Sequence, residues 1–258
     1  MSHDTPRTEI SSRDNPRFKT LRKLVGDASS YRTLGRLWVE GEHLCDAALA
    51  RGWAPQELVV AESGAAFLRR YQGRALRELV LPDRLFAELS ALPSSQGLGM
   101  VFGVPQAQPI DLRAPTVVLD RLQDAGNVGA ILRSASALGF RQVLAIKGTA
   151  ALWGGKVVRA GMGAHFSLAL HEQLSAADVS ALQVPVFATS SHQGEFVHSK
   201  TWPWPCAWVM GHEGQGVSPT LEARAAQRIR IAQPGGEESL NVAAAAAICL
   251  HASGAGRA

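Results

Sequence analysis

Cysteine is scarce in this chain of 258 residues, which has only Cys45, Cys206 and Cys249. The three lie far apart and are odd in number, so their spacing predicts neither a disulfide framework nor a zinc site. We therefore expect a protein of a reducing compartment, the cytoplasm.

Long apolar runs are also missing. No uninterrupted run approaches the roughly 20 residues of a membrane helix, and the amino terminus lacks the charged, apolar, small-residue order of a secretory signal. We expect a cytoplasmic protein with no membrane partner. The chain also has only a small excess of charge of one sign: it contains 26 Lys and Arg and 22 acidic residues, which gives a net charge of +4. Such a modest excess favours a polyanionic partner without proving one.

Two common ligand-binding patterns are absent. The eight histidines show neither H-x-x-E-H nor H-E-x-x-H spacing, and no G-x-G-x-x-G segment occurs. We expect no metal site and no dinucleotide cofactor.

What is present is enough apolar sequence, 46% of residues, for two modest domains. We expect a flexible tail over 1–12, a small α/β domain over 13–104, a proline-rich linker over 105–115 and a second α/β domain over 116–258. Everything chemically specific lies in the second domain.

The first domain is predicted to begin with a helix that starts at Asn15-Pro16 and runs through Leu24. Strands are expected at 37–39, 57–60, 76–81 and 99–104. One helix face is basic and could bind RNA phosphates, although a solvated helix face is an equally ordinary interpretation. The residues of this basic set are Arg13, Arg17, Lys19, Arg22 and Lys23.

The second domain is predicted to be a largely parallel sheet covered on both faces. Strands are expected at 116–119, 142–146, 184–188, 207–210 and 228–231. A helix follows the first strand, with Asn127 as a good cap and Arg133 off its apolar stripe.

Three segments of this domain share one design, a buried strand followed by a polar, glycine-containing loop. They are 120–139, 209–218 and 230–247. In open α/β sheets ligands bind at the carboxyl ends of the strands, so the three loops predict one pocket.

These segments resemble the three signature motifs of the SpoU (TrmH) family of RNA ribose 2′-O-methyltransferases. The first carries N-x-G-x-x-x-R, the second G-x-E-x-x-G and the third S-L-N-V. The matching residues are Asn127, Gly129 and Arg133, then Gly211, Glu213, Gly214 and Gly216, then Ser239, Leu240, Asn241 and Val242. Further forward, the amino-terminal half resembles the substrate-binding domain that often precedes this catalytic domain, through Ile10, Ser11, Asn15, Pro16, Lys19 and Val39-Glu40-Gly41.

The resemblance implies a carboxyl-terminal methyltransferase domain with a trefoil knot, a small amino-terminal α/β domain that binds RNA, and a homodimer. It implies S-adenosylmethionine as the cofactor and structured RNA as the partner, ribosomal RNA rather than transfer RNA. By the same resemblance the catalytic residues are Arg133, Asn127, Glu213, Ser239 and Asn241, and the cofactor-binding residues are Thr189, Gly211, Gly216, Ile231 and Leu240. Asn15 joins the basic set as an RNA-binding residue. The chain departs from the family at Ala125, His212, Ala232 and Gln233, and these departures bear on the details of the cofactor loops.

Arg133 is the main candidate for the essential polar group. A guanidinium almost never gives up its proton. The hypothesis is therefore that Arg133 clamps a neighbouring phosphate whose oxygen helps to take the proton of the ribose hydroxyl. Taken without the family, Arg133 reads as a solvated helix residue.

The other candidates also have plainer interpretations. Asn127 and Ser239 can each be a helix cap, and Glu213 can be an exposed turn residue or one that orders its loop. Three other functions stay open: a transfer-RNA 2′-O-methyltransferase, a non-catalytic RNA-binding or assembly module of the same fold, and a base methyltransferase, which the S-L-N-V segment disfavours.

Overall fold

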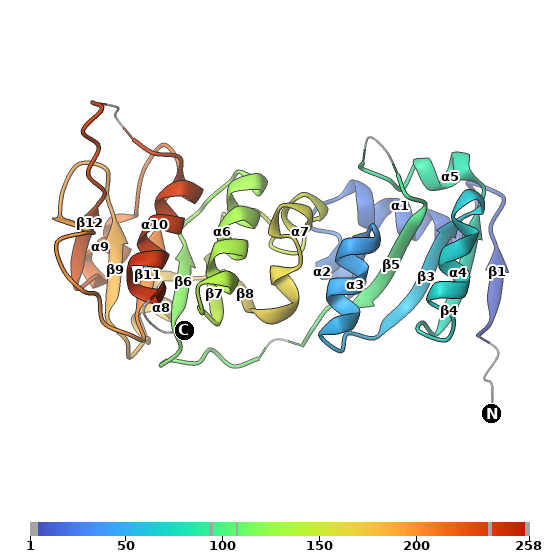
Figure 1. The fold of residues 1–258 in the computed structure, drawn as a ribbon, viewed down its shortest axis with the longest axis horizontal. Coiled ribbons are helices and arrows are strands. Elements are labelled where there is room, and N and C mark those ends of the chain that lie inside the picture. Colours follow the sequence, from blue (N-terminus) through green and yellow to red (C-terminus); the bar gives the residue numbers. More distant parts are fainter. Residues whose placement is uncertain (1–4, 93–94, 107, 237–238, 256–258) are drawn as a thin grey trace. The chain divides into compact units, whose positions relative to one another are not determined.

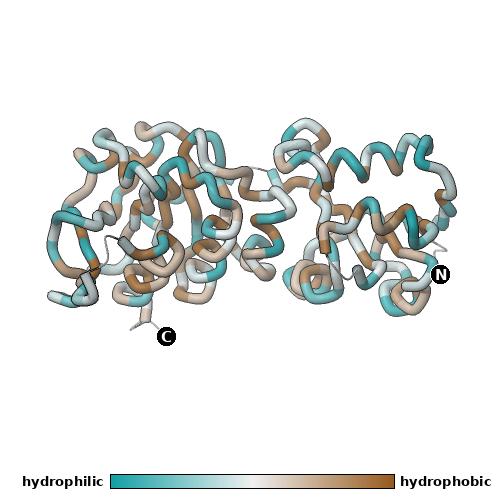
Figure 2. The backbone as a smooth tube through the Cα atoms, turned by 90° about the horizontal axis from the view of Figure 1, so that it is seen from above, coloured by the Kyte–Doolittle hydropathy of each residue, from teal (hydrophilic) through white to brown (hydrophobic). Residues whose placement is uncertain are grey.

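The computed structural model describes residues 5–92, 95–106, 108–236 and 239–255. The chain forms two compact units, one of residues 1–106 with 153–155, the other of residues 107–152 with 156–258. Residues 1–4 of the predicted tail and residue 107 of the predicted linker lie outside the described residues. In each unit the hydrophobic stretches run through the interior, as the hydropathy colouring shows (Figure 2).

The first unit is built around a five-stranded sheet of order β1-β4-β3-β5-β2, in which β5 runs antiparallel to β3 and β2 (Figure 1). Its strands are β1 (Arg7–Glu9), β2 (Arg36–Glu40), β3 (Pro55–Ala61), β4 (Arg77–Leu81) and β5 (Leu98–Gly103). Its helices are α1 (Pro16–Gly26), α2 (Tyr31–Leu34), α3 (Glu42–Ala50), η1 (Glu62–Gly64), α4 (Ala65–Arg70) and α5 (Asp83–Ala87).

The predicted first helix is confirmed, and its start has a clear cause. The side chain of Asn15 accepts a hydrogen bond from the backbone N–H of Arg17 at 2.9 Å, and Pro16 occupies the first turn. The expected flexible tail is wrong for residues 7–9, which form β1 and pair with β4. Ile10, next to that strand, is only 1% exposed. Long-range pairing and burial order this segment, and the polar local sequence does not reveal them.

The second unit is a seven-stranded parallel sheet of order β10-β12-β9-β11-β6-β7-β8. Its strands are β6 (Thr116–Leu119), β7 (Gln142–Ile146), β8 (Ala169–Leu174), β9 (Val186–Thr189), β10 (Glu195–Phe196), β11 (Ala207–Met210) and β12 (Gln227–Arg230). Its helices are α6 (Ala125–Ala137), α7 (Gly155–Gly161), η2 (Ala164–Ser167), α8 (Ala176–Ser180), α9 (Pro219–Arg224) and α10 (Val242–Gly254). The parallel sheet is the predicted one, and β8 and β10 at its two edges are additional.

Alternation along the strands creates two cores. In β6, Val117 faces one core and Val118 the other. The first core includes residues of α6 and α10, and the second includes residues of α8 and α9. Both faces of the sheet are therefore covered, as the continuous apolar strands predict.

Two predicted helix caps are corrected. Helix α6 begins at Ala125 and is capped by Asp124, whose carboxylate accepts from the N–H of Asn127 at 2.7 Å. Helix α10 is capped by Asn241 rather than Ser239, through acceptance from the N–H groups of Ala243 and Ala244. Asn127 thus lies inside its helix with its side chain available for other contacts.

Candidate active site

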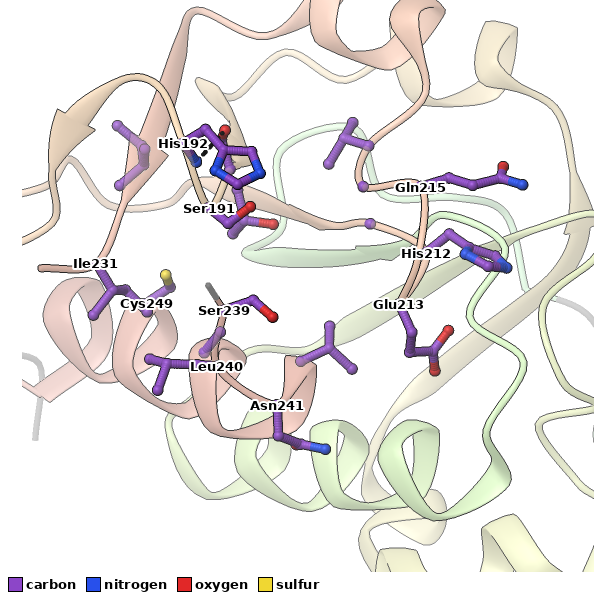
Figure 3. A pocket seen from close by; sticks show the side chains of 18 of the residues that line it. Ser191, His192, His212, Glu213, Gln215, Ile231, Ser239, Leu240, Asn241 and Cys249 are labelled. Carbon is purple, nitrogen blue, oxygen red and sulfur yellow. Dashed lines mark hydrogen bonds between the residues drawn. The ribbon is translucent and has the colours of Figure 1, made fainter. Parts of the chain in front are cut away.

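The carboxyl ends of four neighbouring strands, β12, β9, β11 and β6, lie at one edge of the second sheet. The loops that follow β9, β11 and β12 surround a cavity of about 740 Å³ (Figure 3). Its walls are formed by segments 189–192, 211–217 and 239–242, by Ile231 and Gln233, and by further residues of α9, β12 and α10. Two of the three segments predicted to form one pocket, 209–218 and 230–247, therefore line it. The third, 120–139, contributes no lining residue, and the loop after β9 lines the pocket instead.

The loop after β11 is a tight turn closed by its own backbone. His212 and Gly216 exchange two hydrogen bonds, of 3.0 Å and 2.8 Å. Gly216 has a φ of +68°, and a Cβ on Gly211 would collide with the backbone of Gly216 and Val217. Both glycines are therefore required for the shape of the turn.

The end of that loop is held by a residue that follows the neighbouring strand β6. The carboxylate of Asp120, directly after β6 and 1% exposed, accepts from the N–H of Ser218 at 2.6 Å. Its other oxygen accepts from Nε of Arg121 at 2.9 Å, and Nη1 of Arg121 donates to Gln215 at 3.0 Å. This network, which the sequence analysis did not single out, holds the turn at Gln215 and directly after it at Ser218.

Three of the predicted catalytic side chains meet beside the pocket. Nδ2 of Asn241 donates to Oδ1 of Asn127 at 2.9 Å, and Nδ2 of Asn127 donates to Oε1 of Glu213 at 3.3 Å. Figure 3 shows Glu213 and Asn241 projecting from their two loops toward the same side of the pocket. Residues from three separate motifs are joined in one hydrogen-bonded chain.

Glu213 also accepts from the backbone N–H groups of Gln123 at 3.4 Å and Asp124 at 3.3 Å. Partial burial by itself raises the pKa of Glu213. Hydrogen bonds from its own backbone N–H, from Asn127 and from these two amides outweigh that effect, so the pKa lies below its ordinary value. The carboxylate is therefore ionised at neutral pH, and as a hydrogen-bond acceptor it holds its own loop to the loop after β6 and to Asn127.

All five predicted cofactor-binding residues line the pocket, and Ser239 lines it too. The hydroxyl of Thr189 donates to the carbonyl of Val209 at 2.8 Å and so ties β9 to β11. Ile231 and Leu240 supply apolar lining (Figure 3).

Several lining residues escaped the sequence analysis. Ser190, Ser191 and His192 follow β9, and the rule that ligands bind after parallel strands would have found them. Cys249 reaches the pocket from α10, and burial raises its pKa to about 12. The thiol is therefore protonated and is part of the lining rather than a nucleophile.

Arg133 does not join this group. Its side chain is exposed, lies outside the pocket lining and makes no hydrogen bond or ion pair with any described residue. Arg133 lies six positions after Asn127 on α6, which turns it by roughly 240° around the helix axis. The convergence expected for Arg133 is thus not found among the described residues of one chain.

The predicted RNA-binding set of the first unit is partly engaged by the protein itself. Arg13 pairs with Glu88 at 2.6 Å, and Lys19 pairs with Asp14 at 3.0 Å. Arg17 approaches Glu57, and Asn15 is the cap of α1. The remaining two, Arg22 and Lys23, are exposed on α1.

The described ranges contain neither a cluster of metal ligands nor a candidate membrane helix. No group of three or more His, Cys, Asp or Glu side chains within 5–255, apart from the gaps named above, is arranged to hold a metal ion. Over the same ranges, no helix combines the length and apolar character needed to cross a membrane.

Comparison with known proteins gives one consistent result. The sequence model described as the SpoU rRNA Methylase family matches residues 114–251. The chain is 27% identical over 246 residues to the 23S rRNA (guanosine(2553)-2′-O)-methyltransferase RlmP of Bacillus subtilis, covering 94% of this chain and 98% of that protein. It is 33% identical over 141 residues to the 23S rRNA (guanosine-2′-O-)-methyltransferase RlmB of Bordetella pertussis, covering 53% and 58%.

Solved structures agree across nearly the whole chain. A TrmH-family protein from Porphyromonas gingivalis superimposes with a TM-score of 0.82 at 31% identity, covering 93% of this chain and 97% of that one. The S-adenosylmethionine-bound rRNA methyltransferase from Sinorhizobium meliloti superimposes with the same TM-score at 26% identity, covering 95% and 97%. The likeness therefore includes the first unit as well as the second.

Proposed function

The chain belongs to the SpoU rRNA methylase family, and we propose that the cleft formed by its loops 189–192, 211–217, 231–233 and 239–242 binds the methyl donor and presents it to RNA. The protein is an S-adenosylmethionine-dependent methyltransferase that modifies a ribose 2′-hydroxyl of RNA. The observation that carries the site is the chain of hydrogen bonds that joins Asn241, Asn127 and Glu213 beside the pocket.

The pocket fits this donor. Its volume of about 740 Å³ lies inside the usual range for small-molecule sites. Ile231 and Leu240 offer apolar surface for a nucleoside, and the glycines at 211 and 216 leave backbone groups accessible. S-adenosylmethionine, when bound, supplies an electrophilic methyl group.

Asn127 and Asn241 are proposed to orient the ribose, and Glu213 to hold Asn127 in place. Asn241 uses its oxygen to cap α10 and one N–H to bind Asn127, so its second N–H is available to a ligand. Ser239, two residues before this cap, is proposed to contact the donor or the ribose from the pocket wall. These groups place a weak nucleophile in line with the methyl group.

Arg133 is proposed to bind the phosphate next to the target ribose. Its guanidinium is exposed and has no hydrogen-bond or ion-pair partner among the described residues, so its donors are available to RNA. The clamped phosphate oxygen would assist removal of the hydroxyl proton, because the guanidinium does not give up its own proton and Glu213 is held by Asn127 and the backbone of its neighbouring loop.

Ribosomal RNA is the proposed substrate. RlmP and RlmB are both named as 23S rRNA methyltransferases, and RlmP matches the chain over almost its whole length. The first unit is proposed to be the RNA-binding domain, with contacts from α1. Action on RNA and the three reduced, buried cysteines favour the cytoplasm as the place of action.

A trefoil knot is proposed for the second unit. Strand β12 lies between β10 and β9, although β10 and β9 are consecutive in the chain. The segment that leaves β9 therefore passes beyond β12, forms β10 and returns to β11 on the other side of β9. A later strand enclosed by an earlier loop is the arrangement that such a knot requires.

The test is to incubate the protein with labelled S-adenosylmethionine and total RNA from a strain lacking its gene. We expect label in 23S rRNA, located on a ribose by mass spectrometry of digested nucleosides. Arg133→Lys should lose most activity at saturating RNA, because lysine lacks the planar pair of donors.

Each alternative has its own outcome in this assay. A methylated base, or label only in transfer RNA, would overturn the proposed reaction or substrate. Absence of donor binding in a calorimetric titration would identify a non-catalytic module. Full activity of Arg133→Lys would remove Arg133 from the mechanism.

A further inference from the structure

Three arginines of the first unit converge on one buried carboxylate. Nη1 of Arg17, Arg36 and Arg77 lies 3.9 Å, 3.7 Å and 3.8 Å from the same oxygen, Oε1 of Glu57. The Glu57 side chain is 6% exposed, whereas the arginine side chains are 39%, 41% and 39% exposed in that order. One carboxylate thus lies beneath three half-exposed guanidinium groups.

The topology of the sheet produces this cluster. Strands β2, β3 and β4 run in the same direction, because β5 is antiparallel to both β2 and β3 and β4 is parallel to β3. Arg36 is the first residue of β2, Arg77 is the first of β4, and Glu57 lies opposite Arg77 in the register. Helix α1, which packs on β2, adds Arg17. Residues separated by up to 60 positions therefore meet near the amino-terminal ends of strands β2, β3 and β4.

The contacts of the cluster differ from those of an ordinary structural ion pair. In the same sheet, Arg7 binds Glu78 with two hydrogen bonds, of 3.0 Å and 2.9 Å. All three distances to Glu57 exceed hydrogen-bonding range. Among the described residues, Arg17, Arg36 and Arg77 donate no side-chain hydrogen bond, and Nη1 of Arg17 is buried without an acceptor.

The charges are also unbalanced. Three guanidinium groups face one carboxylate, and no other described carboxylate lies within 4.0 Å of their nitrogens. Like charges held this close repel one another, and unsatisfied donors are costly when partly buried. An anion with several oxygens would relieve both effects, and arginine forks match phosphate geometry.

We propose that Arg17, Arg36 and Arg77 form a binding site for a backbone phosphate of the RNA substrate. Glu57 attracts the three guanidinium groups and keeps them close together. This inference rests on the proposed function and extends the predicted RNA contacts from Arg17 on α1 to Arg36 and Arg77 on β2 and β4. Phosphate contacts fix the register of a protein on RNA without reading sequence. The site therefore positions the RNA for the catalytic cleft of the second unit.

The experiment compares the double variant Arg36→Gln/Arg77→Gln with Arg51→Gln/Arg69→Gln, which removes two exposed arginines from the same unit. The probe is a fluorescein-labelled RNA hairpin, with binding followed by anisotropy over a range of salt concentrations. Loss of charged hydrogen bonds should weaken binding by roughly ten-fold per arginine. The slope of log affinity against log salt should fall by about 1 per arginine. The control variant should bind like wild type.

A second variant guards against loss of fold. Arg36→Lys/Arg77→Lys keeps the charge, so it should recover most of the salt slope but only part of the affinity. If the glutamine double variant fails to fold by circular dichroism, the single variants Arg36→Gln and Arg77→Gln are compared with Arg51→Gln, and each should show the ten-fold loss.

The outcomes separate this site from the function on which it rests. A glutamine variant that binds the hairpin like the control, in a protein that methylates RNA, would show a purely structural ion cluster. Inorganic phosphate that stabilises wild type but not the variant, with equal RNA affinity in both, would show a free-phosphate site instead. Wild type that neither binds RNA nor transfers a methyl group would overturn both proposals.

Discussion

At the scale of single residues, the site depends on a few side chains that each make several contacts. Glu213 accepts from two backbone amides and from Asn127, and Asn241 both caps α10 and binds Asn127. The residue types were predicted from the three motifs, but their partners were not. Asn127 reads equally well as a helix cap, because the sequence cannot show that Asp124 takes that position.

Glu213→Gln tests the organising role of the carboxylate. The glutamine side chain has one acceptor oxygen where glutamate has two, and its NH₂ group would face the N–H donors that now bind the carboxylate. At least one backbone N–H therefore loses its acceptor. We expect methyl transfer to fall by at least ten-fold and the free energy of unfolding to fall by about 1 kcal/mol. Steady-state kinetics and denaturant unfolding measure the two effects. Glu62→Gln, a change at an exposed residue of the first unit, should alter neither rate nor stability appreciably, and wild-type kinetics for Glu213→Gln would contradict the proposed role.

At the scale of elements, the motif glycine of α6 has a packing role. A Cβ on Gly129 would lie 2.6 Å from the carbonyl oxygen of Val157 and would collide with Ala160. Gly129 therefore allows α7 to lie close against α6. Because α6 also carries Asn127 and Arg133, this contact sets the position of the helix that contributes to the site.

His165, in η2 behind α7, makes the stability of the second unit sensitive to pH. Its Nε2 lies 2.8 Å from the carbonyl oxygen of Leu152. Burial lowers its pKa from 6.5 to about 4, an effect that the hydrogen bond to Leu152 only partly opposes. Between these two values the unfolded chain binds more protons than the folded one, so stability falls as the pH falls through this window.

We expect His165 to cost on the order of 2 kcal/mol of unfolding free energy at pH 5 relative to pH 7. Urea unfolding at both pH values measures the loss. His165→Gln, which cannot titrate, should show a smaller loss, whereas His198→Gln, a change outside the buried core, should behave like wild type. Equal pH dependence in His165→Gln and wild type would refute the assignment.

At the scale of the whole molecule, an exposed apolar surface on the second unit favours a homodimer. Ile248 on α10 is 40% exposed, and Leu240 just before α10 is 39% exposed. Small residues such as Ala244 lie exposed on the same helix. We propose that a second copy of the chain covers this surface, because small side chains permit close helix packing across a two-fold axis.

Light scattering should give the mass of a dimer for wild type. Ile248→Glu should shift the protein toward monomer, because it places a charge where apolar contact is expected. Leu76→Glu changes a residue that is 76% exposed in the first unit and should leave the dimer intact. A monomeric wild type would refute the dimer.

The sequence by itself determined the α/β class of fold, most of the parallel strands of the second unit, and the loops after β11 and β12 that line much of the pocket. These features depend on local periodicity, on strands followed by glycine-containing loops, and on short sequence motifs. Tertiary structure alone decided that residues 7–9 pair as a strand and that Asp124 and Asn241 are the helix caps. It also decided that Asn127, Glu213 and Asn241 form one hydrogen-bonded chain while Arg133 lies apart from it. The convergence of three arginines on Glu57 is likewise a result of the tertiary structure. Each of these is a contact between side chains or strands, and its formation depends on sheet register and on the rotation of helices about their axes. The spacing of residues along the chain specifies neither the register nor the rotation.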